Sequence, residues 1–254
     1  MPVSSTFTIQ FSKQSSALAV RVPIKSDANE IVTTLGLAKP RPVIFISGGA
    51  GNMTDHDVAL TSVVVNDAIA SFAQSRNITV IDGGTDAGVM RMIGEVRRNR
   101  GFTFPLIGIA PHRIVTYPSK NRTRYEAELQ DGHSHFVLID SASWGKESQT
   151  IVDLTRTIAA DTYPMLGILI NGGKIAEQDI FLATSKGEHS IPILVLEGSG
   201  RKADEVSDAV KTGTTSSRII KAIIAGGKID LVGLGGGAQA MLDKLNGHFG
   251  AVNQ

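Results

Sequence analysis

Apolar residues occur along this chain in short uninterrupted runs. Each run is followed by a polar or glycine-rich turn and then by a segment with apolar residues at helical spacing. A short uninterrupted apolar run is typical of a strand that is buried on both faces of a sheet. The predicted strands are 43–46, 78–81, 106–110, 135–139, 165–170, 191–196 and 229–232. Their alternation with helices predicts an α/β fold, a Rossmann-like parallel sheet with helices on both faces.

The first 39 residues follow a different pattern. Residues 6–11 and 17–22 are β-prone and are joined by a polar turn, which predicts a β-hairpin at the edge of the sheet. A short helix that begins at Ser26 and ends near Gly36 is predicted to follow. We expect a single domain over 1–254, in which 1–39 form the hairpin and helix, 40–205 form the core and 206–254 add C-terminal helices and a strand.

Composition narrows the classes of partner. The chain has 25 Lys and Arg residues against 24 Asp and Glu residues, and this balance gives no electrostatic reason to expect nucleic acid or an anionic membrane surface as a partner. The lack of cysteine excludes disulfides, thiolate metal sites and cysteine nucleophiles, and it fits a reducing cytosol. The N-terminal residues show no signal-peptide pattern, and the apolar runs are far shorter than the about 20 residues of a membrane span. We therefore expect a cytoplasmic protein.

The 27 glycines are the distinctive feature of the composition, and many of them follow predicted strands. Two such turns follow consecutive strands; the first contains Gly48, Gly49, Gly51 and Asn52, and the second contains Gly83, Gly84, Thr85 and Gly88. Glycine lets the backbone approach a ligand closely, and the N–H groups at a following helix start attract a phosphate. The alternative, that a glycine turn only packs a helix against a strand, explains two neighbouring turns less well than one. The pair predicts that the core 40–205 binds a nucleotide-type ligand.

Two further glycine-rich turns are open to both interpretations. Gly198, Ser199, Gly200 and Arg201 follow a predicted strand and suit a phosphate, although a capped surface helix explains them as well. The run 233–238 matches the G-x-G-x-x-G/A dinucleotide fingerprint and lies between a predicted strand and a predicted helix. Because no further strand with a ribose-binding acid follows it, we interpret this match as mainly structural.

The segment after the fourth predicted strand carries side chains suited to the rest of a nucleotide. Asp140 can accept hydrogen bonds from ribose hydroxyls, Trp144 can stack on a base, and Glu147, close to Gly145, can orient a ligand or act in acid–base chemistry. Equally, Trp144 can belong to the core and Glu147 can favour a helix N-terminus. The polar stretch 116–132 is long for a connection and is interpreted as a lid or binding loop.

The histidines indicate no metal site. The spacing of His112, His133 and His135 matches no metal-binding motif, and the sequence offers no evident third ligand. His112 follows a predicted strand directly and is the histidine that we most expect to meet a ligand. A serine hydrolase is not expected either, because the chain has no G-x-S-x-G motif.

Several of these motifs, taken in chain order, resemble the SLOG superfamily. The resemblance is strongest to its LSDAT branch, which occurs in prokaryotic proteins and in the N-terminal region of melastatin-type TRP channels. The motifs are 83–89, 107–111, 133–140, 144–147 and 196–204. The resemblance implies a Rossmann-like fold that binds nucleotide-derived ligands, including molecules of the ADP-ribose type. It also implies that the turns 48–52, 83–88 and 198–201 form the pocket.

The wider superfamily includes the LOG phosphoribohydrolases, once called lysine decarboxylase-like, whose P-G-G-x-G-T-x-x-E motif carries a catalytic glutamate. Here 140–147 stands at that place, the Pro-Gly-Gly is absent, and Glu147 lies two rather than four residues after Gly145. Two functions stay open. We favour a binding or sensing module for an ADP-ribose- or NAD-like ligand in nucleotide signalling. The alternative is an N-glycosidic-bond hydrolase of the phosphoribohydrolase or NAD glycohydrolase type, with Glu147 as the candidate catalytic residue.

No cofactor is expected apart from that nucleotide-type ligand. A homo-oligomer remains an open alternative to a monomer. A subunit whose main role is assembly, with glycine turns that bind nothing, is the third and weakest function.

Overall fold

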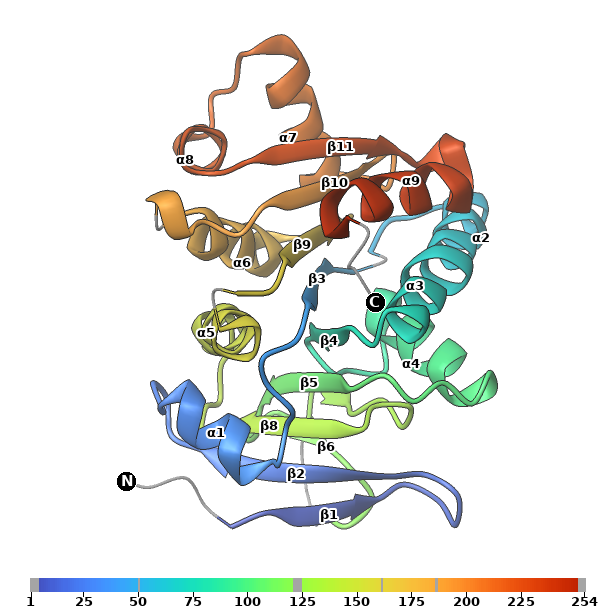
Figure 1. The fold of residues 1–254 in the computed structure, drawn as a ribbon, viewed down its shortest axis with the longest axis vertical. Coiled ribbons are helices and arrows are strands. Elements are labelled where there is room, and N and C mark those ends of the chain that lie inside the picture. Colours follow the sequence, from blue (N-terminus) through green and yellow to red (C-terminus); the bar gives the residue numbers. More distant parts are fainter. Residues whose placement is uncertain (1–4, 50, 121–124, 161, 186, 251–254) are drawn as a thin grey trace.

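The computed structural model describes residues 5–49, 51–120, 125–160, 162–185 and 187–250. They form one nine-stranded sheet with helices on both faces (Figure 1). In order across the sheet the strands are β1 (Phe7–Gln10), β2 (Ser16–Val22), β8 (His135–Ile139), β5 (Leu106–Pro111), β4 (Thr79–Asp82), β3 (Val43–Gly48), β9 (Met165–Ile170), β10 (Ile193–Glu197) and β11 (Ile229–Gly233). The short strands β6 (Val115–Thr116) and β7 (Ala127–Glu128) pair separately.

Only β1 runs antiparallel to its neighbour, so the predicted edge hairpin and the predicted parallel sheet are both confirmed. β2 continues the hairpin into the sheet by pairing in parallel with β8, where Val20 stands opposite Val137. The hairpin therefore extends the sheet by two strands rather than lying against it.

The α-helices of the described chain are α1 (Ala28–Thr34), α2 (Asp55–Val63), α3 (Ser71–Ser75), α4 (Gly88–Asn99), α5 (Ser148–Ala159), α6 (Lys174–Thr184), α7 (Arg201–Thr212), α8 (Arg218–Gly226) and α9 (Gly237–Phe249). A π-helical segment, η1 (Val64–Ala70), joins α2 to α3, and two 3-10 turns lie at η2 (Gly187–His189) and η3 (Leu234–Gly236). The single helix predicted after the first glycine turn is thus interrupted by η1. Thr54 caps α2, because its hydroxyl accepts the N–H of Asp57 at 3.1 Å.

Strand β3 shows why its sequence is apolar without interruption. Val43 and Phe45 face one layer of helices, which contains α1, α5, α6, α7 and α8. Ile44 and Ile46 face the other layer, which contains η1, α4 and α9. A strand covered on both faces has no solvent side, so every position is apolar.

The strand order reverses at β3. From β3 the chain moves through β4 and β5 to β8 on one side, and it then returns to β9 on the other side (Figure 1). In open α/β sheets, ligands bind outside the carboxyl ends of the strands at such a switch point. We therefore expect a ligand to bind near the turns that follow β3 and β9.

Candidate functional site

A cleft of about 500 Å³ lies at this switch point. A volume of this size is in the range of small-molecule and cofactor sites, which is roughly 300–1,000 Å³. The cleft is lined by the ends of β3 and β4, the starts of α5 and α6, and single residues from the neighbouring loops. The lining residues are Ile46, Ser47, Gly48, Gly83, Thr85, Ala87, Met90, Ala127, Trp144, Glu147, Ile151, Gly173, Lys174, Ile175, Ala176, Asp179 and Arg201.

The turns after β3 and β9 approach each other closely at Gly48. A Cβ atom on Gly48 would lie 1.9 Å from the carbonyl oxygen of Ile170, so no other residue fits there without moving a strand. The N–H of Gly49 donates to the same carbonyl at 3.2 Å. Gly48 is thus needed for strand packing, and that packing brings the two turns together at the cleft.

Asn171 fastens three turns to one another. It has a left-handed backbone (φ 56°), and its side-chain Nδ2 donates to the carbonyls of Gly51 at 3.1 Å and Ser199 at 2.7 Å. Its Oδ1 accepts the N–H of Gly172 at 2.8 Å. The buried amide therefore holds the turns that follow β3, β9 and β10 in one arrangement.

The guanidinium of Arg201 lies over the glycines at the mouth of the cleft. A Cβ on Gly51 would be 2.9 Å from its Nη1, and a Cβ on Gly173 would be 2.8 Å from its Nη2. Within the described chain, neither the side chain of Arg201 nor that of Lys174, which lines the same mouth, forms a hydrogen bond or an ion pair. Both residues begin helices, α7 and α6, whose first turns have no side-chain cap.

Two carboxyl groups form the floor of the cleft. Glu147, immediately before α5, and Asp179, on α6, are both buried at 4% exposure. The Ser47 hydroxyl donates to Asp179 Oδ2 at 2.5 Å. Burial raises the pKa of Asp179 to about 7, the hydroxyls of Ser148 and Ser47 lower it, and the neighbouring Glu147 raises it. Burial also raises the pKa of Glu147, against the opposing effect of nearby backbone groups.

The upper walls of the cleft are more apolar. Trp144, Met90 and Ile175 line it, and the Trp144 Nε1 donates to Glu126 Oε2 at 2.7 Å. This hydrogen bond joins the segment after β8 to the stretch 116–132. A flat aromatic surface beside a charged mouth can stack on a base or another planar group.

The structure brings only part of the predicted site to this cleft. Six of the predicted residues line it: Gly48, Gly83, Thr85, Trp144, Glu147 and Arg201. Gly51 lies under the Arg201 guanidinium. The other predicted ligand residues are not among those that line the cleft, namely Gly49, Asn52, Gly84, Gly88, His112, Asp140, Gly145, Gly198, Ser199 and Gly200.

Several of these outlying residues have structural roles. A Cβ on Gly84 would lie 2.7 Å from the Cα of Gly108, so Gly84 allows β4 and β5 to pack. The Ser199 hydroxyl donates to the Leu196 carbonyl at 2.5 Å and accepts the N–H of Asn171 at 2.7 Å. Ser199 therefore holds the turns that follow β9 and β10 together.

Asp140 and His112 belong to a charged cluster outside the cleft. Exposed Asp140 pairs with Arg113 at 2.8 Å, and this hydrogen bond lowers the pKa of its carboxyl. Burial, together with Lys120 and Arg21, lowers the pKa of His112 to about 4. The imidazole is therefore neutral at pH 7.

The cleft residues that the sequence-based prediction did not name include Ser47, Gly173, Lys174, Ala176 and Asp179. The glycine pair at 172–173 after the fifth predicted strand is a usable signal for part of this set. Asp179 also has a signal, because it stands next to Ile180 and three residues before Leu182 on the inward side of an amphipathic helix. An acid at such a position is costly unless it has a partner or a function.

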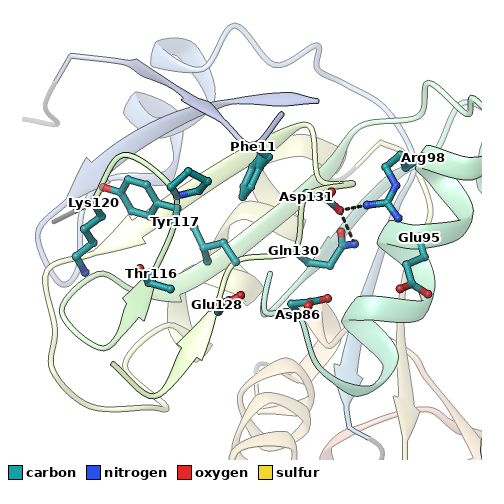
Figure 2. Close-up of a pocket in the computed structure, with 12 residues that line it drawn as sticks. Phe11, Asp86, Glu95, Arg98, Thr116, Tyr117, Lys120, Glu128, Gln130 and Asp131 are labelled. Atoms are coloured by element: carbon teal, nitrogen blue, oxygen red, sulfur yellow. Dashed lines mark hydrogen bonds and ion pairs between the residues drawn. The ribbon is translucent and has the colours of Figure 1, made fainter. Parts of the chain in front are cut away.

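A second hollow, of about 450 Å³, is lined largely by residues of the stretch 116–132 (Figure 2). Figure 2 shows Arg98 and Gln130 contacting Asp131, and Phe11 and Tyr117 standing on the same side of the hollow. Asp86, which also lines it, pairs with Arg91 at 3.0 Å. Because these charges are already paired, the switch-point cleft is the stronger candidate site.

The predicted lid is only partly described. Residues 121–124 of the stretch 116–132 lie outside the described residues. Ala127 from this stretch lines the switch-point cleft, whereas Thr116 and Leu129 line the second hollow. The described part therefore contributes residues to both cavities.

The described ranges contain neither a candidate metal site nor a candidate membrane-spanning helix. No group of three or more His, Asp or Glu side chains there is arranged to hold a metal ion. No described helix has the length and apolar character needed to cross a membrane.

Comparison with known proteins places the chain in a family. Residues 41–243 match the family described as "SLOG in TRPM, prokaryote". The chain is 25% identical over 248 residues to the transient receptor potential cation channel subfamily M member 2 of Rattus norvegicus, a match that covers 82% of this chain and 16% of the channel. A subfamily M member-like 2 channel of Nematostella vectensis is also 25% identical, over 77% of this chain and 15% of the channel.

Among solved structures, TM1055 matches with a TM-score of 0.53 and 15% identity, over 82% of this chain and 99% of that one. This likeness supports the fold alone. The family match extends beyond the segment 40–205 that carries the sequence motifs, and it includes β11 and part of α9. The chain therefore belongs to the prokaryotic branch of the SLOG domains that are related to the N-terminal regions of TRPM channels.

Proposed function

We propose that this protein binds a nucleotide-derived ligand of the ADP-ribose or NAD type in the switch-point cleft and acts as a sensing module. The observation that carries this proposal is the position of Arg201. Its guanidinium lies beside Gly51 and Gly173 where α6 and α7 begin, and the described chain supplies no acidic partner for it.

Each part of that arrangement favours a phosphate. At the start of α6, where Gly173 supplies no side-chain cap, the first N–H groups and the helix dipole attract an anion. In α7 the N–H groups of Lys202 and Ala203 already donate to the carbonyls of Gly172 and Asn171, so this helix contributes mainly the Arg201 side chain. A guanidinium can bind two phosphate oxygens at once, and Lys174 adds a second positive charge at the same mouth. One helix start and two cations suit a pyrophosphate better than a single uncharged group.

The family relationship also favours a nucleotide-type ligand. SLOG domains in general imply a nucleotide-like ligand. The channel relatives are far longer than this chain, so their activity as channels is not carried over. We infer a cytoplasmic sensor, in line with the absence of cysteine.

A screen of ADP-ribose, cyclic ADP-ribose, NAD, AMP and ATP by thermal shift and calorimetry tests the proposal. A ligand that binds only the folded state raises the melting temperature by mass action. We expect at least one of these ligands to do so, with ADP-ribose or NAD binding more tightly than AMP. If none of the five binds, the proposed function is wrong.

A glycine variant locates the binding. Gly173→Val places a side chain where the phosphate is expected, and its backbone (φ −123°) accepts valine. The nearest atoms to the new Cβ belong to the flexible end of Arg201. We expect binding to weaken at least about tenfold while the melting temperature without ligand stays close to that of the wild type.

Gly235→Val is the matched control. Gly235 is exposed and lies in the fingerprint-like run 233–238, and a Cβ there would meet nothing within 4 Å. We expect this variant to bind the ligand like the wild type. Weaker binding in Gly235→Val but normal binding in Gly173→Val would move the site to the end of β11.

A hydrolase is the second candidate function, and the burial of Glu147 at the cleft floor is the observation that favours it. A carboxyl with a raised pKa can serve as a general acid near neutral pH. Chromatography of each ligand after incubation separates the two functions. Ligand recovered intact supports a sensor, whereas released nicotinamide, adenine or ribose phosphate supports an N-glycosidic-bond hydrolase.

A further inference from the structure

The two floor carboxyls have unused hydrogen-bonding capacity. Glu147 Oε2 and Asp179 Oδ1 are both buried and neither accepts a hydrogen bond of normal geometry in the described chain, although the Ser148 hydroxyl, which also lacks such a bond, lies close enough to Asp179 to lower its pKa. Both residues line the cleft. A buried carboxyl oxygen without a donor is unfavourable, and each such atom in a native protein calls for an explanation. A ligand that brings donor groups to the floor would supply the missing partners.

The floor adjoins the place where the phosphate is expected. Ser47 donates to Asp179 and immediately precedes Gly48, which ends β3 at the glycine turn. On α6, Asp179 lies five residues after Lys174, which begins the helix at the mouth. If one ligand contacts both places, the group at the floor must be a near neighbour of the phosphate at the mouth.

In a nucleotide, the group next to the phosphate is the sugar. Ribose carries adjacent hydroxyl groups, and each of them can donate a hydrogen bond to a carboxyl oxygen. The base lies farther away and is planar, which suits the wall that contains Trp144. A metal ion is a poorer occupant, because the described residues offer no cluster of three or more acidic or histidine ligands.

We propose that Asp179 and Glu147 together form a ribose-recognition floor, which accepts hydrogen bonds from the hydroxyls of a ribose whose phosphate lies against Arg201 and Lys174. This assignment rests on the proposed function, and it names the part of the ligand that determines specificity. Asp179 and Glu147 would then be the residues that distinguish ribose from deoxyribose.

A pH dependence follows from the same groups. The pKa of Asp179 is affected by Ser148 and Glu147 at the start of α5 and by Ser47 of β3. The cations of the cleft are Lys174 and Arg201. Since burial raises the pKa of Asp179 to about 7, the free protein holds a proton there in part at neutral pH. Hydroxyl donors stabilise the ionised carboxylate and so lower its pKa on binding. Ligand binding should therefore release protons near pH 7 and become tighter as the pH rises through 7.

Calorimetric titration of the whole protein with ADP-ribose tests the assignment. Its pyrophosphate has no ionisation near pH 7, so a change of proton binding reports on the protein. The comparison uses four analogues, each of which lacks the 2- or the 3-hydroxyl of one ribose. We expect at least one deoxy analogue to bind the wild type about tenfold more weakly than ADP-ribose. Titrations in two buffers of different ionisation enthalpy should show proton release.

Asp179→Asn keeps the size of the side chain and removes the charge. We expect this variant to bind ADP-ribose about tenfold more weakly, to lose its discrimination against the same deoxy analogue, and to release no proton. Asp208→Asn, which removes an exposed carboxylate from α7, should behave like the wild type in all three respects.

The outcomes distinguish a failure of the ribose-recognition floor from a failure of the proposed nucleotide binding. If the wild type binds ADP-ribose and all four deoxy analogues equally well, the ribose floor is wrong and the binding function stands. A preference that depends on the amino group of adenine, seen by replacing adenine with hypoxanthine, would likewise overturn it in favour of a base contact. If neither ADP-ribose nor any other nucleotide of the screen binds, the proposed function fails and the floor assignment falls with it.

Discussion

At the scale of single residues, Asp179 shows how a buried polar group can indicate a site. Its carboxyl is enclosed by α5, α6 and β3, and one of its oxygens lacks a partner in the described chain. A buried carboxyl of this kind destabilises the folded state when it is ionised. The protein retains it at the floor of the cleft, which is the pattern expected where function outweighs stability.

The raised pKa of Asp179 predicts how stability changes with pH. The folded state binds the proton up to about pH 7, whereas the unfolded state releases it near pH 4. The folded protein thus holds more protons between these values, and stability falls as the pH rises from 4 to 7. We expect this loss to reach up to roughly 4 kcal/mol and to be largely absent in Asp179→Asn.

Urea unfolding of both proteins at pH 5.5 and pH 8.5 measures this difference directly. The variant should be the more stable protein at pH 8.5, and its advantage should be roughly half as large at pH 5.5, which lies midway between the folded and unfolded pKa values of Asp179. An equal pH dependence in both proteins would mean that Asp179 is ionised in the folded state across this range.

Arg201 gives a second prediction at the residue scale. Its backbone is left-handed (φ 51°), a conformation that asparagine tolerates well. Arg201→Asn therefore removes the guanidinium with little added strain. We expect nucleotide binding to weaken about tenfold or more and to lose much of its salt dependence, as measured by calorimetry at two ionic strengths. Unchanged affinity in a folded variant would remove Arg201 from the site.

At the scale of elements, the site depends on how three turns are fastened together. Asn171 at the end of β9 holds the carbonyls of Gly51 and Ser199 in the turns after β3 and β10. The residue is buried, so its loss leaves these carbonyls without a donor. The geometry of the phosphate site is therefore set by a side chain that need not touch the ligand.

Asn171→Gly tests this arrangement, because glycine keeps the left-handed backbone and removes the amide. We expect the free energy of unfolding to fall by about 2–3 kcal/mol and nucleotide affinity to fall as well. Chemical denaturation and calorimetry provide the two values. A loss of stability with normal affinity would show that the turns hold their positions without Asn171.

The elements also show what the sequence can predict. Alternating apolar runs determine where strands and helices lie, so the parallel sheet and the edge hairpin both follow from local patterns. The interruption of one helix at η1 and the order of the strands depend on contacts between distant segments. Local periodicity contains no information about such contacts.

The same limit explains the partial prediction of the site. Glycine turns after strands identify one edge of the sheet, and Gly48, Gly83 and Arg201 line the cleft at that edge. Strand order then decides which turns meet. Because β9 pairs with β3, the pair 172–173 and Asp179 enter the cleft, while His112 and Asp140 lie in a separate charged cluster.

At the scale of the whole molecule, the stretch 116–132 contributes residues to both the switch-point cleft and the second hollow. The cleft at the strand switch has cations without an acidic partner and carboxyl oxygens without a donor, whereas in the second hollow Arg98 pairs with Asp131 (Figure 2) and Asp86 pairs with Arg91. We therefore assign the nucleotide to the switch-point cleft. We also expect 1–254 to behave as one cooperative domain, because a single sheet runs through both sides of the switch point.

An amide NMR titration with ADP-ribose tests this central assignment most directly, and a chain of 26.9 kDa is suitable for it. We expect the largest changes in chemical shift on residues 47–49, 51–52, 171–174 and 198–202, around the turns after β3, β9 and β10. Changes confined to Phe11, Thr116, Leu129 and Gln130 would place the ligand in the second hollow and would contradict the switch-point site.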